Sequence, residues 1–161
     1  MTEHGIWVIE NKQEAKILRK RMASFDFSKH SPKEIRALLA RMRQAMKDAN
    51  GVGLSANQIG LDMHVFVALV DGKFYAVFNS KITKTSREIS TVEEGCLSVP
   101  EVFGDVTRPE KVTLEGYDKN DKKLKIKAWG LLARVFQHES DHLNGTVFID
   151  KATGLHKYEA Q

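Results

Sequence analysis

Gln137-His138-Glu139-Ser140-Asp141-His142-Leu143 stands at the end of a stretch, residues 131–143, that is predicted to be helical and to stop before Asn144-Gly145. Two histidines four residues apart lie on one face of a helix with Cβ atoms about 5–6 Å apart, so both can reach one metal ion. Glu139 is rotated from His138 by about 100°, and therefore faces the space beside the ion. A helix with two surface histidines matches the same pattern by chance.

Strands gather in the middle of the chain, with helices before and after them. Ser31-Pro32-Lys33-Glu34 is a helix start signal, and Asp71-Gly72 between two apolar runs indicates a β-hairpin. The expected elements are a helical or irregular segment at 15–24, a helix at 31–50, a tight loop at 51–60, strands at 64–69, 74–79, 111–117 and 123–127, and the helix at 131–143. This order predicts an α+β fold, with mainly antiparallel sheets around the central helix, as a single domain over residues 1–161.

A catalytic metal site needs a third protein ligand, because three protein groups leave one position open for water. Downstream of the helix, His156 lies in no recognisable motif. Upstream, Cys96 is the single cysteine and stands in Glu94-Gly95-Cys96-Leu97-Ser98. A lone cysteine is often a small buried hydrophobe, but the glycine beside it permits close backbone approach to a ligand. The residues alone leave both interpretations of Cys96 open.

Three segments together resemble the peptide deformylase family, whose signatures are a GxGLxAxQ loop, an EGCLS turn and an HExDH helix, in this order. They are residues 51–58, 94–98 and 137–143, and the likeness extends over roughly residues 31–150. Three separate matches in the right order make coincidence remote. There are two departures. Ser55 replaces the usual alanine and is expected to be tolerated, and only eleven residues follow Asp150, too few for the long C-terminal helix of many bacterial members.

The resemblance implies a metal-dependent hydrolase that removes the N-formyl group from N-formylmethionyl peptides of newly made proteins and releases formate. It implies one divalent ion, natively Fe²⁺ with Zn²⁺, Ni²⁺ or Co²⁺ as substitutes, held by Cys96, His138 and His142. The implied catalytic groups are Glu139 as general acid/base, with Gln58 and the backbone N–H of Leu97 as donors to the oxyanion. Backbone groups of Val52, Gly53 and Gly95 are implied to pair with an extended substrate peptide.

The helix itself carries two further predictions. Leu131 and Val135 share the face of the two histidines, so they are expected to form an apolar wall that suits a methionine side chain, although both positions also suit ordinary core residues. Asp141 is predicted to accept hydrogen bonds from Arg108 and so to fix the helix, the alternative being a solvated surface carboxylate.

The composition is that of an ordinary globular protein, with 42% hydrophobic and 29% charged residues and a net charge of +4. The lysines are scattered, so nucleic-acid binding is not expected as a main role. No apolar run reaches the roughly 18 residues that span a bilayer, and the N-terminus does not read as a signal peptide. We therefore expect a cytoplasmic enzyme without membrane attachment, whose partners are formylated nascent peptides. Docking on the ribosome is expected only if it does not depend on a C-terminal helix.

Three other classes of protein share parts of this pattern. A zinc peptidase built on HExxH alone would need neither the EGCLS segment nor the glutamine loop. A structural zinc module would need four closed ligands, whereas three good ones are present. A zinc deaminase would need a Pro-Cys-x-x-Cys segment, which the sequence lacks.

Overall fold

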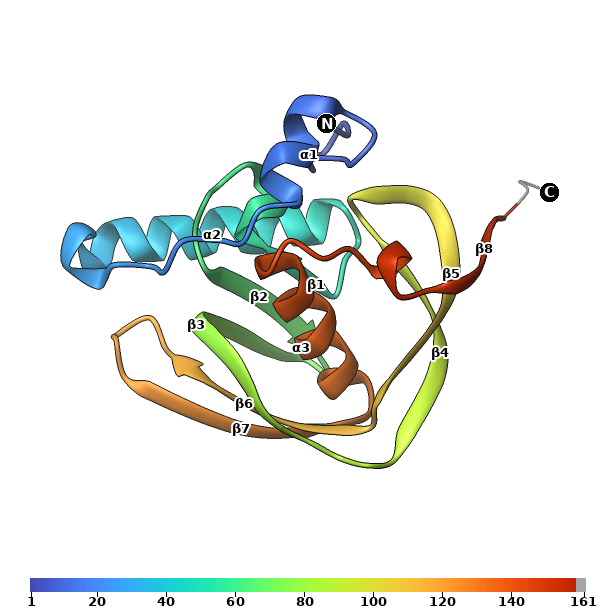
Figure 1. The fold of residues 1–161 in the computed structure, drawn as a ribbon. Coiled ribbons are helices and arrows are strands. Elements are labelled where there is room, and N and C mark those ends of the chain that lie inside the picture. The colour runs from blue at the N-terminus through green and yellow to red at the C-terminus, as the bar shows by residue number, and fades with distance from the viewer. Residues whose placement is uncertain (159–161) are drawn as a thin grey trace.

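The computed structural model describes residues 1–158, whose arrangement is shown in Figure 1. Within this range there are three α-helices, which are α1 (Lys12–Leu18), α2 (Pro32–Asp48) and α3 (Gly130–Leu143). Short 3₁₀ helices lie at Phe27–Lys29, Ala56–Ile59 and Phe148–Asp150. The strands of the same range are β1 (Gly53–Ser55), β2 (Val65–Val70), β3 (Lys73–Thr85), β4 (Ile89–Cys96), β5 (Val99–Pro109), β6 (Lys111–Tyr117), β7 (Lys123–Trp129) and β8 (Thr153–Lys157).

The strands form two antiparallel sheets. One has five strands in the order β1-β2-β3-β6-β7, and the other has three in the order β4-β5-β8. Helix α3 lies between the sheets and contacts strands of both, whereas α2 packs against β1 and β2 (Figure 1). The predicted α+β fold, with antiparallel sheets around the helix that carries both histidines, is confirmed.

Helix α2 begins where the start signal predicts. The Ser31 hydroxyl accepts a hydrogen bond from the backbone N–H of Glu34, and the Glu34 carboxylate accepts one from the backbone N–H of Ser31, both at 3.1 Å. Together they satisfy two backbone donors that a helix start otherwise leaves free. The buried stripe of α2, which is Ile35, Leu39, Met42 and Met46, packs against the five-stranded sheet.

The five-stranded sheet is covered on both faces, which explains the apolar run of β2. Val65 and Val67 belong to the core cluster that includes α2, whereas Phe66 and Ala68 belong to the cluster that includes α3. A continuous apolar run is typical of a strand that is buried on both faces. Phe136 anchors α3 in the second cluster, and this contact sets which face of α3 is left for the site.

Strands β2 and β3 form the hairpin that Asp71-Gly72 predicts. Both residues have positive φ, 50° and 76°, as a two-residue type I′ turn requires. Strand β3 is longer than predicted and continues to Thr85. Beyond Phe78 it pairs with β6 alone, and the register of this pairing has two irregularities. Polar residues in this part of β3 obscure the alternation of apolar and polar residues by which a strand is predicted.

The sequence patterns do not predict β4 and β5, which form a long curved hairpin (Figure 1). Many of their residues are polar and exposed, so the alternation that marks a strand is weak. Residues 94–96, expected in a turn, are the end of β4. The loop expected at 51–60 contains β1 and a 3₁₀ helix, and the helix near the N-terminus covers Lys12–Leu18 rather than 15–24.

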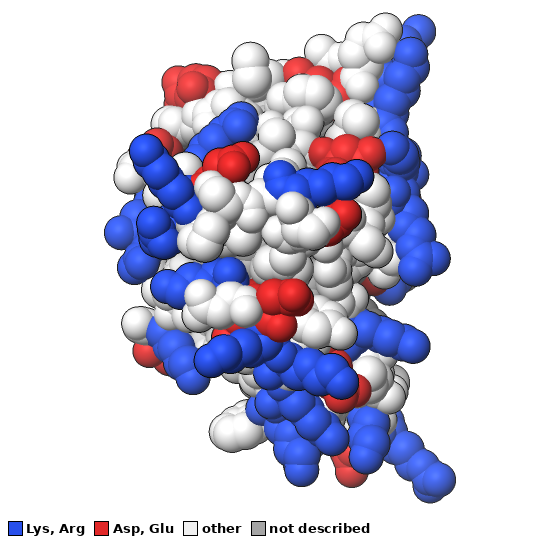
Figure 2. Space-filling model, turned by 90° about the vertical axis from the view of Figure 1, so that its left-hand side faces the viewer, with Lys and Arg blue, Asp and Glu red and all other residues white. Residues whose placement is uncertain are grey.

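Charged side chains cover much of the surface. Figure 2 shows lysines and arginines concentrated in the lower part of one face, with carboxylates among them. Strand β7, at the edge of its sheet, exposes Lys123, Lys125 and Lys127, and lysines on an edge strand discourage pairing with another chain. In residues 1–158 no helix is long and apolar enough to cross a membrane.

Candidate metal centre

Helix α3 brings the two histidines of the motif together. The Nε2 atoms of His138 and His142 are 3.2 Å apart, and their rings are 4.9 Å apart between centroids. His142 is 1% exposed. Burial lowers the pKa of His142 well below its ordinary value, and a neutral imidazole is the form that binds metal ions.

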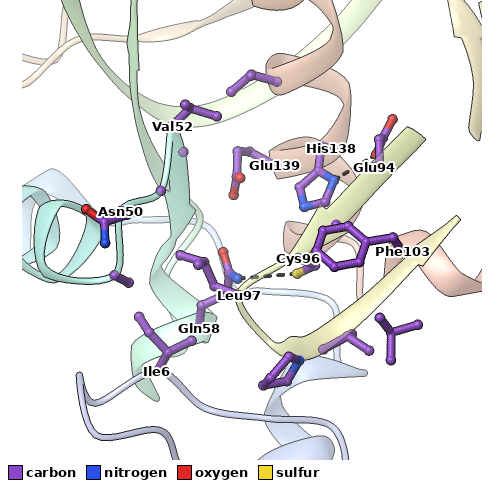
Figure 3. Close-up of a pocket in the computed structure, with 18 of the residues that line it drawn as sticks. Ile6, Asn50, Val52, Gln58, Glu94, Cys96, Leu97, Phe103, His138 and Glu139 are labelled. Carbon is purple, nitrogen blue, oxygen red and sulfur yellow. Dashed lines mark hydrogen bonds and ion pairs between the residues drawn. The ribbon is translucent and has the colours of Figure 1, made fainter. Parts of the chain in front are cut away.

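Cys96 lies at the end of β4, close to His138 (Figure 3). Its Sγ is 3.1 Å from the Nε2 of His142, and the ligand atoms of Cys96, His138 and His142 all lie within 4.8 Å of one another. In a tetrahedral site with bonds of about 2.0–2.3 Å, ligand atoms are roughly 3.3–3.6 Å apart. The three side chains therefore have the chemistry and the spacing to hold one metal ion.

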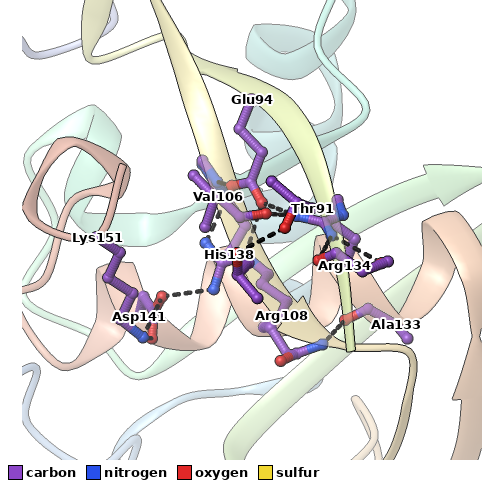
Figure 4. A network of polar contacts seen from close by, with 12 residues as sticks. Thr91, Glu94, Val106, Arg108, Ala133, Arg134, His138, Asp141 and Lys151 are labelled. Carbon is purple, nitrogen blue, oxygen red and sulfur yellow. Dashed lines mark hydrogen bonds and ion pairs between the residues drawn. The ribbon is translucent and has the colours of Figure 1, made fainter. Parts of the chain in front are cut away.

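Glu94 holds the first of these histidines from behind. Its carboxylate is 3.0 Å from the Nδ1 of His138 and also accepts hydrogen bonds from Arg108 (2.7 and 3.0 Å) and Arg134 (2.6 Å), as Figure 4 shows. Burial by itself would raise the pKa of Glu94, but the hydrogen bonds from His138 and Arg108 outweigh it and hold the pKa well below its usual range. An ionised partner at Nδ1 leaves the Nε2 lone pair of His138 available to bind a metal ion.

Sequence reasoning assigned no role to Glu94 or to Arg134. The role of Glu94 could have been predicted from one general rule, which is that metal-binding histidines commonly donate their second ring N–H to a carboxylate. No comparable rule indicates a role for Arg134, because an arginine on a helix is usually exposed to solvent. In the structure Arg134 donates to Glu94, to the carbonyls of Val106 and Ser90 and to the Ser90 hydroxyl, and so ties α3 to the β4–β5 hairpin.

The predicted pair between Arg108 and Asp141 is confirmed. Arg108 Nη1 donates to Asp141 Oδ2 at 2.8 Å, and the Arg108 side chain is 3% exposed. Lys151 also reaches Asp141, at 3.0 Å, from a more exposed position. Asp141 thus fixes α3 to β5 through a buried donor.

Asp141→Ala is expected to lower the free energy of unfolding by about 1–3 kcal/mol, because it leaves a buried guanidinium donor of Arg108 unpaired. Lys151→Met removes the exposed partner of the same carboxylate and is expected to cost about 1 kcal/mol or less. Urea denaturation of both variants measures the difference. Equal losses would show that Asp141 contributes only as an exposed charge.

Glu139 points into the space beside the ligand atoms (Figure 3). It is 3% exposed, and its Oε2 has no hydrogen-bond partner within residues 1–158. Burial raises the pKa of Glu139 to about 7. Gly53 makes room for this carboxylate, because a Cβ at that position would lie 2.8 Å from Glu139 Oε1.

The Gln58 side chain is held in one orientation. Its Oε1 accepts a hydrogen bond from the backbone N–H of Ser55 at 3.0 Å, and its Nε2 donates to the Ser98 hydroxyl at 3.1 Å. The same Nε2 is 3.7 Å from Cys96 Sγ. The hydroxyl of Ser55 is not only tolerated but takes part in this arrangement. It lies within hydrogen-bond distance of Asn57 Oδ1 (2.6 Å) and of Gln58 Oε1 (3.1 Å).

One cavity of about 530 Å³ collects the residues singled out by the sequence. Of the predicted metal, catalytic and substrate-binding residues, all but the buried His142 line it, namely Val52, Gly53, Gln58, Gly95, Cys96, Leu97, Leu131, Val135, His138 and Glu139. Val135 is buried, whereas Leu131 and Val52 are about half exposed. The cavity is therefore an open groove that has Val52, Leu131 and Val135 as apolar lining and that reaches Cys96 and His138 of the candidate metal site.

Comparisons with known proteins agree with this geometry. Residues 7–158 match the family described as polypeptide deformylase. The chain is 44% identical over 118 residues to a peptide deformylase of Treponema pallidum, covering 73% of each chain. It is 42% identical over 144 residues to one of Synechocystis, covering 84% of this chain and 74% of the relative.

Solved structures show the same likeness. A peptide deformylase from Thermotoga maritima has a TM-score of 0.83 and 33% identity, with 92% of this chain and 96% of that one covered. A probable peptide deformylase from synechococcus phage S-SSM7 has a TM-score of 0.81 and 37% identity, with 91% and 97% covered. This chain therefore belongs to the polypeptide deformylase family of enzymes.

Proposed function

We propose that this enzyme hydrolyses the N-formyl group of N-formylmethionyl peptides and releases formate. One observation carries the proposal, which is the convergence of Cys96, His138 and His142 beside the buried carboxylate of Glu139, whose Oε2 has no hydrogen-bond partner among residues 1–158. Hydrolysis of an amide needs an activated water, a proton carrier and donors for the oxyanion, and the groove offers a candidate for each.

A single divalent ion is the proposed cofactor, with Fe²⁺ as the native metal and Zn²⁺, Ni²⁺ or Co²⁺ as substitutes. The choice of Fe²⁺ rests on the family resemblance, since zinc binds such donor sets more tightly than ferrous iron does. Three protein ligands leave one position open, as catalytic sites do. A metal ion in such a site polarises a carbonyl and lowers the pKa of water from 15.7 towards about 7.

Glu139 is the proposed general acid/base. Its carboxylate accepts the proton of the attacking water and then delivers it to the nitrogen of the departing amine. A pKa near 7, caused by burial, favours both transfers at neutral pH, because the best catalytic pKa lies near the working pH.

Gln58 and Leu97 are the proposed donors to the oxyanion. The two bonds that Ser55 and Ser98 make with Gln58 hold its amide NH₂ on the side of Cys96, so little reorganisation is needed when charge develops. Removal of one such donor in other acyl-transfer enzymes costs about 2.7–4 kcal/mol.

The substrate peptide is proposed to lie extended along the groove. Backbone groups of Val52, Gly53 and Gly95 pair with it, and the side chains of Val52, Leu131 and Val135 form the wall for methionine. A Cβ at Gly95 would lie 2.8 Å from the ring of Phe103 on the paired strand, so the β4–β5 hairpin itself requires glycine at this position. Formylated nascent peptides are thus the proposed partners of a cytoplasmic enzyme, and the ribosome is a further proposed partner.

Formyl-Met-Ala-Ser and acetyl-Met-Ala-Ser distinguish this reaction from others. The metal-loaded enzyme is expected to release formate from the first peptide and to cut the second at least about 100-fold more slowly, because Gln58 and Leu97 crowd the position of a methyl group. Enzymatic assay of formate and acetate measures both rates.

Enzyme treated with a chelator is the control, and its activity is expected to return when the metal is restored. Cleavage of internal peptide bonds without formate would instead support a zinc peptidase and contradict the proposal.

A further inference from the structure

The outer face of the five-stranded sheet, on the side away from α3, carries a row of lysines on strand β7. Lys123, Lys125 and Lys127 alternate along this strand with Leu124 and Ile126, which pack against the core cluster that includes α3. Side chains in a strand point to opposite faces in turn, so the three lysines share the outer face. Strand β7 runs along the lower edge of the molecule in Figure 1, and the lower part of the face in Figure 2 is rich in lysine and arginine.

The pairing of strands adds two more lysines to this face. Thr113 of β6 lies opposite Lys127 on one side and opposite Lys84 of β3 on the other. Lys111 of β6 lies opposite Trp129, at the end of β7. These lysines are far apart along the chain, and only the register of the sheet gathers them. We call this surface the lysine face, and its lysines are Lys84, Lys111, Lys123, Lys125 and Lys127.

The charges of the lysine face are not neutralised by ion pairs. The lysines that form ion pairs within residues 1–158 are Lys20, Lys29 and Lys151, none of which belongs to this face. Glu115 of β6 lies opposite Lys125, and it forms no ion pair with any lysine within the same range. The face therefore presents a net positive charge to a partner.

A hollow of about 580 Å³ opens on the lysine face beside Trp129. Its lining includes Lys84, Lys111 and Lys127 and holds no carboxylate. Trp129 is 71% exposed, so the faces of its ring are available to a ligand. Cations and a flat aromatic surface are thus within reach of one bound molecule.

Protection of a sheet edge explains only part of this surface. Lysines on an edge strand discourage pairing with another chain, and this suits the three lysines of β7. Strand β6 is paired on both sides, so Lys111 protects no edge. The exposed ring of Trp129 weakens such protection, because it offers apolar surface to another chain.

We propose that the lysine face and Trp129 bind single-stranded RNA with little preference for sequence. Alternate residues of a strand are about 6.6 Å apart and neighbouring strands about 4.8 Å apart, so the lysines can contact several phosphates of one RNA chain. The bases of a single strand are free to stack on an aromatic ring, and such stacking tolerates any base. A lipid surface is flat, and attachment to it takes more buried apolar area than one ring supplies.

Binding is measured on zinc-loaded enzyme with a fluorescein-labelled oligouridine of about 12 nucleotides, a usual length for such sites. Saturable binding is expected, with log K falling by about 2–3.5 per tenfold rise in salt, since about three to five phosphates contribute about 0.7 each on a single strand. Stacking is expected to quench tryptophan fluorescence. Trp129→Phe should remove this quenching, because Trp7 is the other tryptophan, and should keep most of the affinity.

Two double variants with the same loss of charge separate the lysine face from general attraction to a basic protein. Lys125→Gln with Lys127→Gln is expected to weaken RNA binding about fivefold or more. Lys33→Gln with Lys47→Gln, at exposed positions of α2, should change it by less than about twofold, because salt screens distant charges. Trp129→Ala should weaken binding about fivefold or more, the scale of one stacked base. Circular dichroism of each variant shows that it is folded.

Polyglutamate and vesicles of phosphatidylcholine and phosphatidylserine are the competing ligands. The enzyme is expected to bind both more weakly than RNA at the same salt concentration, because neither offers a base to Trp129. Equal or tighter binding to either of them overturns the proposal. So do equal effects of the two double variants, and tryptophan fluorescence that RNA leaves unchanged. None of these results bears on the release of formate, so the proposed reaction is tested separately.

Discussion

Glu139→Ala is expected to keep its metal and to lose about 10²–10⁴-fold or more in turnover, the scale of a positioned general acid/base. The carboxylate lies beside the ligand atoms but is not one of the three that converge. Its removal therefore leaves the metal site complete and takes away the proton carrier. Metal content by atomic absorption and turnover of formyl-Met-Ala-Ser are measured on the same preparation.

Two variants control for shape and for charge. Glu139→Gln keeps the side-chain volume and removes the proton-accepting oxygen pair, so its loss should be similar. Glu93→Gln changes a carboxylate that lines the same groove but is paired with His156 and Tyr158, so it should retain most activity. Loss of metal from Glu139→Ala would instead make Glu139 a ligand and overturn its proposed role.

Cys96→Ser is expected to lose bound metal and activity while the chain stays folded. Changes to groups behind the ligands already cost about 10–100-fold in metal affinity, so loss of the thiolate itself should cost at least about 100-fold. Cys96 packs only as a partly buried residue against the small cluster of Val99, Val106, Val147 and Phe148 and lies outside the two larger clusters around α2 and α3, so circular dichroism should report a native fold.

His156 supplies the matched control for this experiment, because it is the other third ligand that the sequence leaves open. In the structure His156 lies on β8 and pairs with Glu93, at 3.1 Å, outside the group that converges on the metal position. His156→Ala should therefore keep its metal. Metal retained in Cys96→Ser and lost in His156→Ala would reverse the assignment.

The sequence alone predicted those parts of the fold that are formed by residues close to one another along the chain. The capping box of Ser31 and Glu34, the positive-φ turn at Asp71-Gly72 and the spacing of His138 and His142 each lie within a few residues. The structure shows the corresponding helix start, hairpin and histidine pair. Such features could be predicted because nearby residues satisfy the backbone and set the side-chain directions.

The candidate metal position could not be predicted from local sequence patterns alone. Cys96 could be joined to the two histidines only through the resemblance carried by three separate segments, since nothing in its own segment tells a ligand from a buried thiol. The structure supplies the geometric reason, which is that the end of β4 places Sγ 3.1 Å from a ring nitrogen that lies 46 residues away along the chain.

Only the tertiary structure decided which charged residues are buried and what they hold. Glu94 meets Arg108 across 14 residues and Arg134 across 40, and the hairpin of β4 and β5 that brings them together has no clear apolar period. A buried charge is stable only beside its partners, and the sequence around each residue does not show where those partners will be.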